Sequence, residues 1–190
     1  MQEVVLVRHG ETEWSRELRH TGRTDVPLTD EGERQARRLA EALRGREFAL
    51  VLSSPLRRAA ETAGLAAFEP ELRDDLMEWD YGDYEGRRTE EIREEVPDWT
   101  IWRSGAPSGE TPEEVGARAG RVIAEIRAVY GDVLVFAHGH LLRVLAARWV
   151  GLDASYGAAL GLDTAGLSRL GWEREQPVIR LWNEPAGQPS

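Results

Sequence analysis

Arginine and histidine side chains occur in three short clusters, and each cluster follows an apolar segment of the sequence. The clusters are Arg8-His9, Arg57-Arg58 and His138-Gly139. Guanidinium groups match phosphate oxygens bidentately and neutralise their charge, so several arginines and histidines in one pocket would suit a phosphoryl group. Taken alone, Arg8-His9 is equally compatible with a surface loop that carries an ordinary ion pair. The phosphate interpretation therefore requires that the three clusters meet.

The apolar segments are expected to bring them together. Residues 4–7, 48–52 and 133–136 are short, apolar and rich in Val and Leu, which is typical of buried strands. Helical patterns lie between them, and this alternation predicts a parallel sheet. Ligands of such sheets bind beyond the carboxyl ends of the strands, where each cluster begins.

Capping signals define the intervening helices. Thr29-Asp30-Glu31 predicts a helix start and Gly45 its end, while Thr111-Pro112-Glu113-Glu114 is a capping box. Ser53-Ser54-Pro55 predicts a helix with proline at its first position, which would place the arginine pair in the first turn. Helix N-termini behind Ser54 and His138 would supply backbone N–H donors to an anion.

The expected fold is a three-layer α/β/α sandwich with a mostly parallel central sheet and a small lid-like insertion. We expect one domain over residues 1–183, with two further strands over 167–172 and 178–182, and a flexible C-terminal tail over 184–190. Residues 69–110 are the candidate insertion. Their glycine-punctuated aromatic residues favour a lid or pocket wall over a core element; these are Trp79, Tyr81, Tyr84, Trp99 and Trp102.

Composition restricts the class of partner. The 190 residues carry 34 acidic and 24 basic side chains, a formal charge of −10 that disfavours nucleic acid and anionic membrane surfaces. No apolar run is long enough for a membrane span, and no leader is evident, so we expect a cytoplasmic protein. Cysteine is absent, which excludes disulfides and thiolate metal sites. The four histidines could form a metal site with Glu78 or an aspartate, but the neighbouring arginines would repel a cation, so no metal is expected.

Phosphoryl transfer from an ester also needs a proton donor for the leaving oxygen. Glu78 lies beside Trp79, and a carboxyl group in an aromatic setting can be kept protonated by desolvation. We therefore expect Glu78 to be that donor.

Four motifs, in order along the chain, resemble those of the histidine phosphatase superfamily, which includes the cofactor-dependent phosphoglycerate mutases. They are RHGET from Arg8, SPLRRA from Ser54, Glu78 ahead of YGDYEG from Tyr81, and AHG from Ala137. The resemblance implies that His9 is a nucleophile that forms a phosphohistidine, and that Arg8, Arg58 and His138 hold the phosphoryl oxygens. Glu78 would protonate the leaving alcohol and later deprotonate water. No cofactor is implied.

Two positions need a choice. Helical periodicity does not decide between Arg57 and Arg58, but the family's arginine directly precedes an alanine, which selects Arg58 and leaves Arg57 solvated. Many relatives have asparagine after the tryptophan of the first motif, where this chain has Ser15 after Trp14. A hydroxyl can still bond to phosphate, so Ser15 remains a candidate ligand.

The segments around these motifs resemble the branch that contains sedoheptulose-bisphosphatase-like enzymes, which implies a sugar phosphate or bisphosphate as substrate. The expected substrate-binding residues are Ser15, Thr21, Gly22, Tyr81, Gly139 and His140. His140 could instead cap its helix or contact solvent, and His20 could line the entrance or lie on the surface. Candidate ligands for a second anion, each of which could equally be a surface charge, are Arg23, Arg87, Arg88 and Arg103.

Three functions are compared. The leading one is a phosphomonoester hydrolase that acts through phosphohistidine on small sugar phosphates or bisphosphates. A phosphoglycerate mutase would instead need a bisphosphorylated primer, and a non-catalytic phosphate- or phosphoprotein-binding module would need no proton donor such as Glu78. The expected partner is a small phosphate ester, and the sequence leaves a homodimer open.

Overall fold

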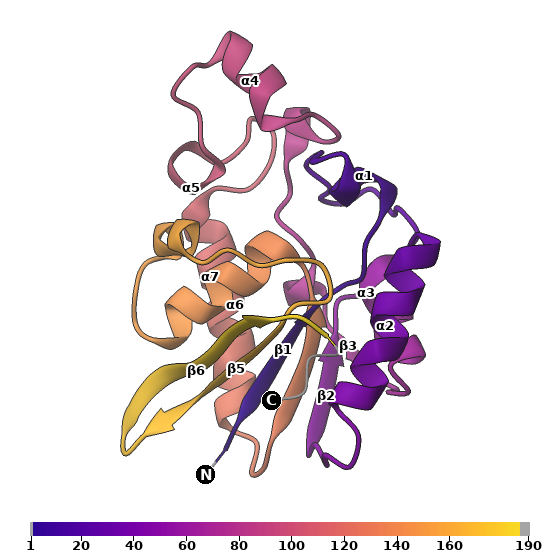
Figure 1. Cartoon of the computed structure of the whole chain (residues 1–190). Helices are drawn as coiled ribbons and strands as arrows, with labels where there is room; N and C mark the ends of the chain where they lie inside the picture. Colours follow the sequence, from indigo (N-terminus) through magenta and orange to yellow (C-terminus); the bar gives the residue numbers. More distant parts are fainter. Residues whose placement is uncertain (1, 187–190) are drawn as a thin grey trace.

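The computed structural model describes residues 2–186 and places a six-stranded sheet at the centre of the molecule (Figure 1). The strands are β1 (Val4–Arg8), β2 (Leu50–Ser53), β3 (Glu71–Leu72), β4 (Val133–Ala137), β5 (Leu167–Glu173) and β6 (Gln176–Glu184). Their order is β3-β2-β4-β1-β5-β6; the first four are parallel, and β5 and β6 add an antiparallel edge. The expected mostly parallel sheet is confirmed.

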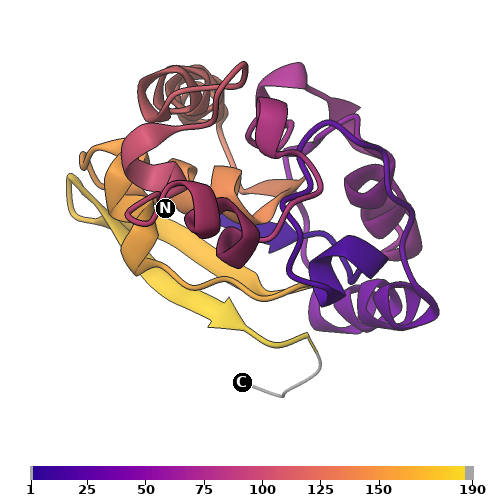
Figure 2. The same cartoon turned by 90° about the horizontal axis from the view of Figure 1, so that it is seen from above.

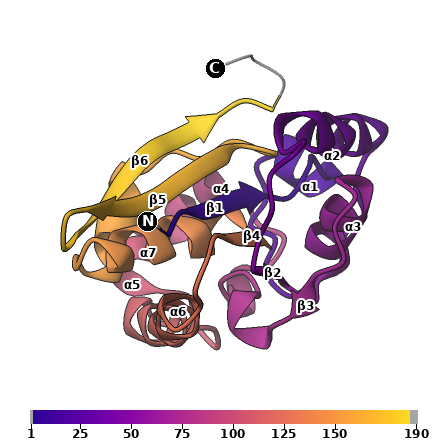
Figure 3. The same ribbon diagram turned by 90° about the horizontal axis from the view of Figure 1, so that it is seen from below.

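Helices cover both faces of the sheet. The α-helices are α1 (Glu13–Arg16), α2 (Asp30–Ala42), α3 (Arg57–Leu65), α4 (Thr89–Glu95), α5 (Ile101–Ser104), α6 (Pro112–Arg127) and α7 (Gly139–Trp149). Short 3-10 helices are η1 (Asp74–Leu76), η2 (Gly82–Tyr84) and η3 (Ala154–Ala159). Figure 3 shows α2 and α3 on one face and α6 and α7 on the other. The three-layer α/β/α architecture is therefore also confirmed.

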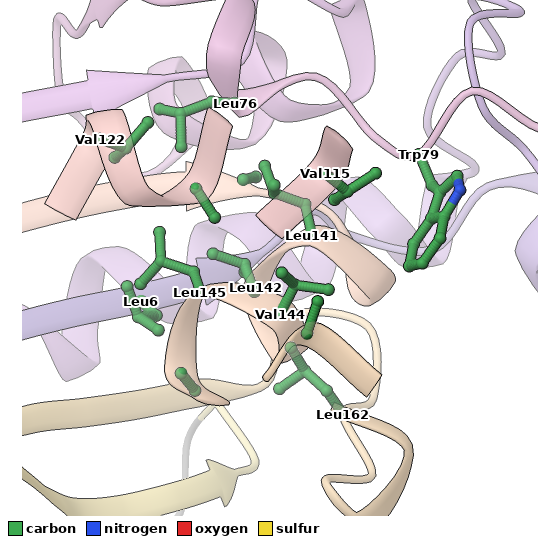
Figure 4. Close-up of a cluster of buried hydrophobic side chains, with 14 of the residues drawn as sticks. Leu6, Leu76, Trp79, Val115, Val122, Leu141, Leu142, Val144, Leu145 and Leu162 are labelled. Atoms are coloured by element: carbon green, nitrogen blue, oxygen red, sulfur yellow. The ribbon is translucent and has the colours of Figure 1, made fainter. Parts of the chain in front are cut away.

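The apolar strands are buried on both faces, which explains why they read as continuous apolar runs. Along β4, Val133 and Val135 belong to the cluster under α6 and α7, whereas Leu134 and Phe136 belong to the cluster under α2 and α3. Figure 4 shows Leu142 and Leu145 of α7 turned toward the sheet. Because each fully buried side chain of this size contributes about 1.5–3 kcal/mol, this packing fixes the ends of the strands that carry the candidate site.

Several expected boundaries are wrong. The helix α3 begins at Arg57 with Leu56 as its N-cap, so Pro55 lies before the helix and not at its first position. The Ser54 hydroxyl accepts the Leu56 N–H at 3.2 Å, and this interaction turns the chain ahead of the helix. The helix α2 ends at Ala42, and Gly45, with φ of 75°, lies in the turn that follows.

The C-terminal boundary differs as well. The strand β6 reaches Glu184, one residue into the segment expected to be a tail, because its residue Glu184 pairs with Leu167 of β5. The rest of that expected tail lies partly outside the described residues. No helix in the described range is long and apolar enough to cross a membrane.

Residues 69–110 combine a sheet edge, a core segment and two helices above the sheet. Residues 71–72 pair with β2 as β3, and α4 and α5 lie beyond the carboxyl ends of the strands (Figures 1 and 2). The expectation that the aromatic residues form a lid and not a core is wrong for Trp79, Tyr84 and Trp99. These side chains are buried in the same apolar cluster as β1 and β4.

Candidate active site

A cavity of about 410 Å³ lies at the carboxyl edge of the parallel strands. Three of the expected catalytic residues, Arg8, His9 and Glu78, line it. Five of the expected substrate-binding residues also line it: Ser15, Thr21, Tyr81, Gly139 and His140. Arg58, His138 and Gly22 are buried and do not line the cavity.

His9 directly follows β1 and is 4% exposed. Its Nδ1 lies 2.7 Å from the carbonyl oxygen of Gly10. A carbonyl only accepts, so Nδ1 carries the proton and Nε2 keeps the lone pair of the neutral imidazole. Burial lowers the pKa of His9 well below its ordinary value, and the charges of Arg58 and Arg8 lower it further. The ring is therefore neutral near neutral pH, and the lone pair of Nε2 is available.

Gly10 is required at the turn that follows His9. A Cβ atom at this position would lie 2.4 Å from the carbonyl oxygen of Gly32, at the start of α2. The Gly10 N–H donates to the hydroxyl of Thr62 on α3 at 3.0 Å. Close packing against α2 and α3 thus fixes the carbonyl that orients the His9 ring.

The two arginines are held by backbone carbonyls. Arg58 is fully buried and donates to the carbonyl oxygens of Thr21, Gly22 and Thr24, at 2.8–3.1 Å. Arg8 donates through Nη1 to the carbonyl oxygen of Leu162 at 2.5 Å. Burial lowers the pKa of both guanidinium groups. Because arginine stays protonated in proteins, both remain cations beside His9.

The second histidine faces His9 across the site. The ring centroids of His9 and His138 are 5.2 Å apart, and Nε2 of His138 lies 2.8 Å from the hydroxyl of Ser54. Burial lowers the pKa of His138 well below its ordinary value, and the charge of Arg58 lowers it further. When the Ser54 hydroxyl donates to Nε2, the proton of the neutral ring is on Nδ1.

Buried donors without partners gather around His9. In the described part of the chain, five buried side-chain polar atoms lack a hydrogen-bond partner, and three of them are Arg8 Nε, Arg58 Nε and His138 Nδ1. A buried donor normally finds an acceptor, because desolvation without one costs about 1–3 kcal/mol. The oxygens of a phosphoryl group on His9 are the acceptors that this set of donors fits.

Glu78 is 4% exposed and lies at the N-terminus of α7. Its Oε1 accepts the N–H groups of Trp79 and Leu141, and its Oε2 accepts that of His140, each at 2.9 Å. The aromatic setting inferred from the sequence is thus replaced by a cradle of backbone donors. A carboxylate has about four lone-pair positions, so Oε2 retains one that can exchange a proton with a group in the cavity.

A buried arginine on α6 holds the segment that carries Glu78. Arg118 is 5% exposed and donates to the carbonyl oxygens of Asp75, Met77 and Glu78, at 2.5–3.1 Å. Its guanidinium also forms two hydrogen bonds to the carboxylate of Glu110 at 2.7 and 2.9 Å. Glu110 in turn accepts the N–H of Asp80 at 2.9 Å. This ion pair therefore clamps the chain on both sides of Glu78.

The structure places the expected substrate-binding residues in different settings. The Tyr81 hydroxyl lies 2.5 Å from Nδ1 of His140. Ser15 lines the cavity, but its hydroxyl donates to the Thr12 carbonyl at 2.9 Å in the capping box of α1. A bond from Ser15 to phosphate would have to replace that cap. The Gly22 N–H donates to the Glu85 carboxylate, so Gly22 supports the loop held by Arg58.

Of the four arginines considered for a second anion, only Arg88 lines the cavity. Arg23 lies within 3.7 Å of carboxylate oxygens of Asp80 and Glu110, and Arg87 pairs with Glu95 at 2.6 Å. Arg103 lines a separate hollow near α6. Arg57 is exposed and pairs with Glu61 at 2.6 Å, in agreement with the choice of Arg58 for the site.

Sequence reasoning missed Arg143, which lines the cavity one turn after Gly139 on α7. Its guanidinium lies 4.4 Å from the ring centroid of Trp102 and donates to the Gly157 carbonyl at 2.9 Å. The spacing of four residues from Gly139 was the available signal, since both positions share one face of a helix that begins at the site. Within the described residues, no group of three or more His, Asp or Glu side chains could hold a metal ion.

These features place a buried neutral imidazole beside unpartnered cationic donors, an arrangement that suits phosphoryl transfer. The family model of the histidine phosphatase superfamily (branch 1) matches residues 4–185, and the chain belongs to this family.

Relatives and solved structures agree with that assignment. An acid phosphatase of Mycobacterium tuberculosis is 40% identical over 190 residues, covering 96% of this chain and 94% of that protein. A sedoheptulose 1,7-bisphosphatase of Saccharomyces cerevisiae is 40% identical, and the match covers 78% of this chain and 67% of the length of that protein. A solved structure of an open reading frame product of Mycobacterium tuberculosis has a TM-score of 0.94 at 38% identity, covering 97% of this chain and 98% of that one. Phosphatase-named relatives of this similarity show that the chain is a phosphatase.

Proposed function

We propose that the protein hydrolyses small phosphate monoesters through a phosphohistidine formed on Nε2 of His9. The observation that carries this proposal is the set of unpartnered buried donors of Arg8, Arg58 and His138 around an imidazole whose Nδ1 is held by a carbonyl. The names of the acid phosphatase and the sedoheptulose bisphosphatase support a small sugar phosphate or bisphosphate as the substrate.

In the first step, Nε2 of His9 attacks phosphorus and the bond to the ester oxygen breaks. The protonated carboxyl of Glu78 gives its proton to the leaving oxygen, so that an alcohol leaves. Arg8, Arg58 and His138 stabilise the charge on the transferring phosphoryl oxygens, and the protein provides these donors before the reaction begins.

In the second step, water replaces the alcohol. The Glu78 carboxylate takes a proton from the attacking water, the bond between phosphorus and Nε2 breaks, and inorganic phosphate leaves with His9 restored. Splitting the transfer in this way replaces one difficult displacement by two easier ones. The same carboxyl oxygen serves both steps, since Oε2 of Glu78 accepts one N–H bond and keeps a position for the proton.

The test measures phosphate release from a panel of phosphomonoesters, sugar mono- and bisphosphates and 3-phosphoglycerate, with EDTA present. Native protein and His9→Ala are compared. We expect release that EDTA does not affect and that the substitution abolishes. Isomerisation of 3-phosphoglycerate that needs a bisphosphorylated primer, without phosphate release, would identify a mutase instead. Phosphate binding without any turnover would identify a binding module.

A further inference from the structure

Two histidines that the proposed mechanism does not use form one wall of the cavity. His20 and His140 both line it, and their ring centroids are 6.1 Å apart. Tyr81 lies between them, with its ring 4.8 Å from that of His20 and its hydroxyl 2.5 Å from Nδ1 of His140. These two imidazoles lie on one wall of the cavity with Arg8 and Glu78, where they can contact a bound substrate.

The surroundings fix both rings. The His140 ring lies 5.0 Å from that of Trp102 and 6.4 Å from that of Trp79. His20 places Nε2 3.1 Å from the Thr89 hydroxyl, and its ring meets the edge of Trp99 at 5.4 Å. Each imidazole is therefore held in one orientation before a substrate arrives, which reduces the entropy lost on binding.

One nitrogen of each ring remains for a ligand. Nδ1 of His140 and Nε2 of His20 are engaged by hydroxyl groups. Among the described residues, neither His140 Nε2 nor His20 Nδ1 forms a hydrogen bond, and neither is among the buried atoms that lack a partner. These nitrogens therefore keep accessible surface, and both residues line the cavity.

The rings are uncharged near neutral pH. Burial lowers the pKa of His20 to about 4 and that of His140 well below its ordinary value, the latter with help from the charge of Arg143. A neutral imidazole nitrogen is a donor or an acceptor according to the tautomer, and a hydroxyl group can satisfy either. An anion could use only a donor, and a cation would be repelled by Arg8 and Arg143.

The outer rim of the cavity offers no concentrated positive charge. Arg19 and Arg88 line it together with Glu17 and Glu90, and Arg19 pairs with Glu17 at 2.8 Å. Arg143 lines the cavity as well, so a second phosphate would meet the carboxylates of Glu17 and Glu90 beside three guanidinium groups, of which that of Arg19 is already paired. The distal part of the cavity is therefore better suited to an uncharged polar ligand than to a second phosphate.

We propose that His20 and His140 form hydrogen bonds with hydroxyl groups of the substrate. The preferred substrates are then phosphate esters of polyhydroxylated alcohols, and a substrate needs only one phosphate group to be recognised. This inference rests on the proposed phosphatase function and adds the residues that select the alcohol. The phosphoryl group lies on His9, and the hydroxyl groups of the leaving alcohol reach the two free imidazole nitrogens.

Matched substrates test the inference. Glycerol 3-phosphate and propyl phosphate differ by two hydroxyl groups, and ribose 5-phosphate and p-nitrophenyl phosphate extend the comparison. We expect native protein to show kcat/KM at least about tenfold higher for glycerol 3-phosphate than for propyl phosphate, since each hydrogen bond contributes up to about tenfold. His140→Phe and His20→Phe should each reduce this ratio several-fold.

Isosteric variants separate hydrogen bonding from packing. The amide of His140→Gln can place a polar group near the position of Nε2, and that of His20→Asn near Nδ1, so both should retain more of the ratio than phenylalanine does. Arg103→Gln, in the separate hollow, is the control and should leave the ratio unchanged.

Equal kcat/KM for the two members of the pair in native protein would overturn the inference while leaving the phosphatase function intact. A glutamine or asparagine variant with no more of the ratio than its phenylalanine counterpart would also contradict it. Failure of every compound to release phosphate would instead refute the proposed function. A preference of more than about tenfold for fructose 1,6-bisphosphate over fructose 6-phosphate would show that a second phosphate is read, against the inference.

Discussion

At the scale of single residues, Glu78 is where the mechanism is most sensitive. Glu78→Gln keeps the side-chain shape but cannot exchange a proton, so kcat should fall about 10²- to 10⁴-fold for alkyl phosphates. Phosphate affinity should change little, because the proposed anion ligands are Arg8, Arg58 and His138, whose buried donors lack partners. Steady-state kinetics together with calorimetric titration of inorganic phosphate measures both quantities. Loss of phosphate affinity in step with kcat would place Glu78 in binding and not in proton transfer.

The pKa of His9 predicts how the rate depends on pH. The nucleophile must be unprotonated, and burial with Arg58 and Arg8 lowers its folded-state pKa below the ordinary value of 6.5. Protonation therefore inactivates the ring only at a pH below 6.5, and the acid limb of kcat/KM should lie there. A pH profile on p-nitrophenyl phosphate measures the limb. An acid limb at or above pH 6.5 that follows His9 would contradict the electrostatic account of the site.

Residue types alone could predict much of this site. Arg8 ends β1, and His9 and His138 directly follow β1 and β4; these positions could be predicted from the sequence. The choice of Arg58 over Arg57 needed the family resemblance, because both lie in the first turn of α3. The hydrogen bonds that hold the Glu78 carboxylate could not be predicted from the sequence. One of the donors is the neighbouring Trp79. The other two come from the start of α7, which lies more than sixty residues further along the chain.

At the scale of secondary structure elements, Arg118 of α6 holds the segment that carries Glu78, the proposed proton donor. Arg118 contacts the carbonyls of residues 75, 77 and 78, so we expect Arg118→Lys, which retains the charge but loses the planar fork, to displace Glu78. Activity on alkyl phosphates should fall about tenfold or more, as a misplacement of 1 Å can cost far more than this. Activity on p-nitrophenyl phosphate, whose leaving group needs little protonation, should fall much less.

The leaving-group dependence separates positioning from stability. If Arg118 only supported the fold, both substrates would lose activity in proportion to the fraction of folded protein. Arg121, which pairs with Asp75 at the surface through hydrogen bonds of 2.6 and 2.9 Å, offers a matched control one turn along the same helix. Arg121→Lys should leave the ratio of the two activities unchanged. An unchanged ratio in Arg118→Lys would refute the positioning role.

Elements with strong local signals could be predicted, and elements set by distant contacts could not. The capping box at Thr111 and the continuous burial of β4 follow from local rules of sequence. The start of α3 was wrong, because Ser54 turns the chain and bonds to His138 instead of capping the helix directly. The aromatic residues of 69–110 were expected to form a lid, because nothing in the local sequence shows that most of them belong to the same core cluster as β1 and β4.

At the scale of the whole molecule, four histidines with lowered pKa values link stability to acid. The folded state binds fewer protons than the unfolded state between the folded pKa and 6.5, so stability falls as the pH drops below 6.5. For His20, with a folded pKa of about 4, the loss between pH 6.5 and 5 is up to about 2 kcal/mol. Above pH 6.5 this slope decreases and is nearly absent by about pH 7.5.

Urea denaturation at several pH values from 7.5 to 5 measures this linkage. Native protein should lose free energy of unfolding steeply below pH 6.5, and His20→Asn should lose about 2 kcal/mol less over the same range. A flat profile in native protein would show that the histidines are hydrated and titrate normally. An identical slope in His20→Asn would show that the burial of His20 does not contribute.

The fold as a whole was the most predictable level. A strand-helix alternation with right-handed crossovers leaves few arrangements of a parallel sheet, and the three clusters then meet at one edge. The cavity itself was less predictable, since Arg143 and the wall of His20 and His140 depend on how four separate segments pack together. The family resemblance supplied roles for residues, whereas the structure shows which groups hold them.

The central claim is that the phosphoryl group is transferred through His9, and the most direct measurement is isolation of the phosphoenzyme. Native protein and Glu78→Gln are mixed with substrate, quenched in alkali within milliseconds to seconds, digested and mapped by mass spectrometry. The account predicts one phosphoryl group on His9. With p-nitrophenyl phosphate as the substrate, whose leaving group needs little protonation, this group accumulates more in Glu78→Gln because mainly the attack by water is slowed. Turnover without any phosphoenzyme in either protein, or a phosphoryl group on another residue, would contradict it.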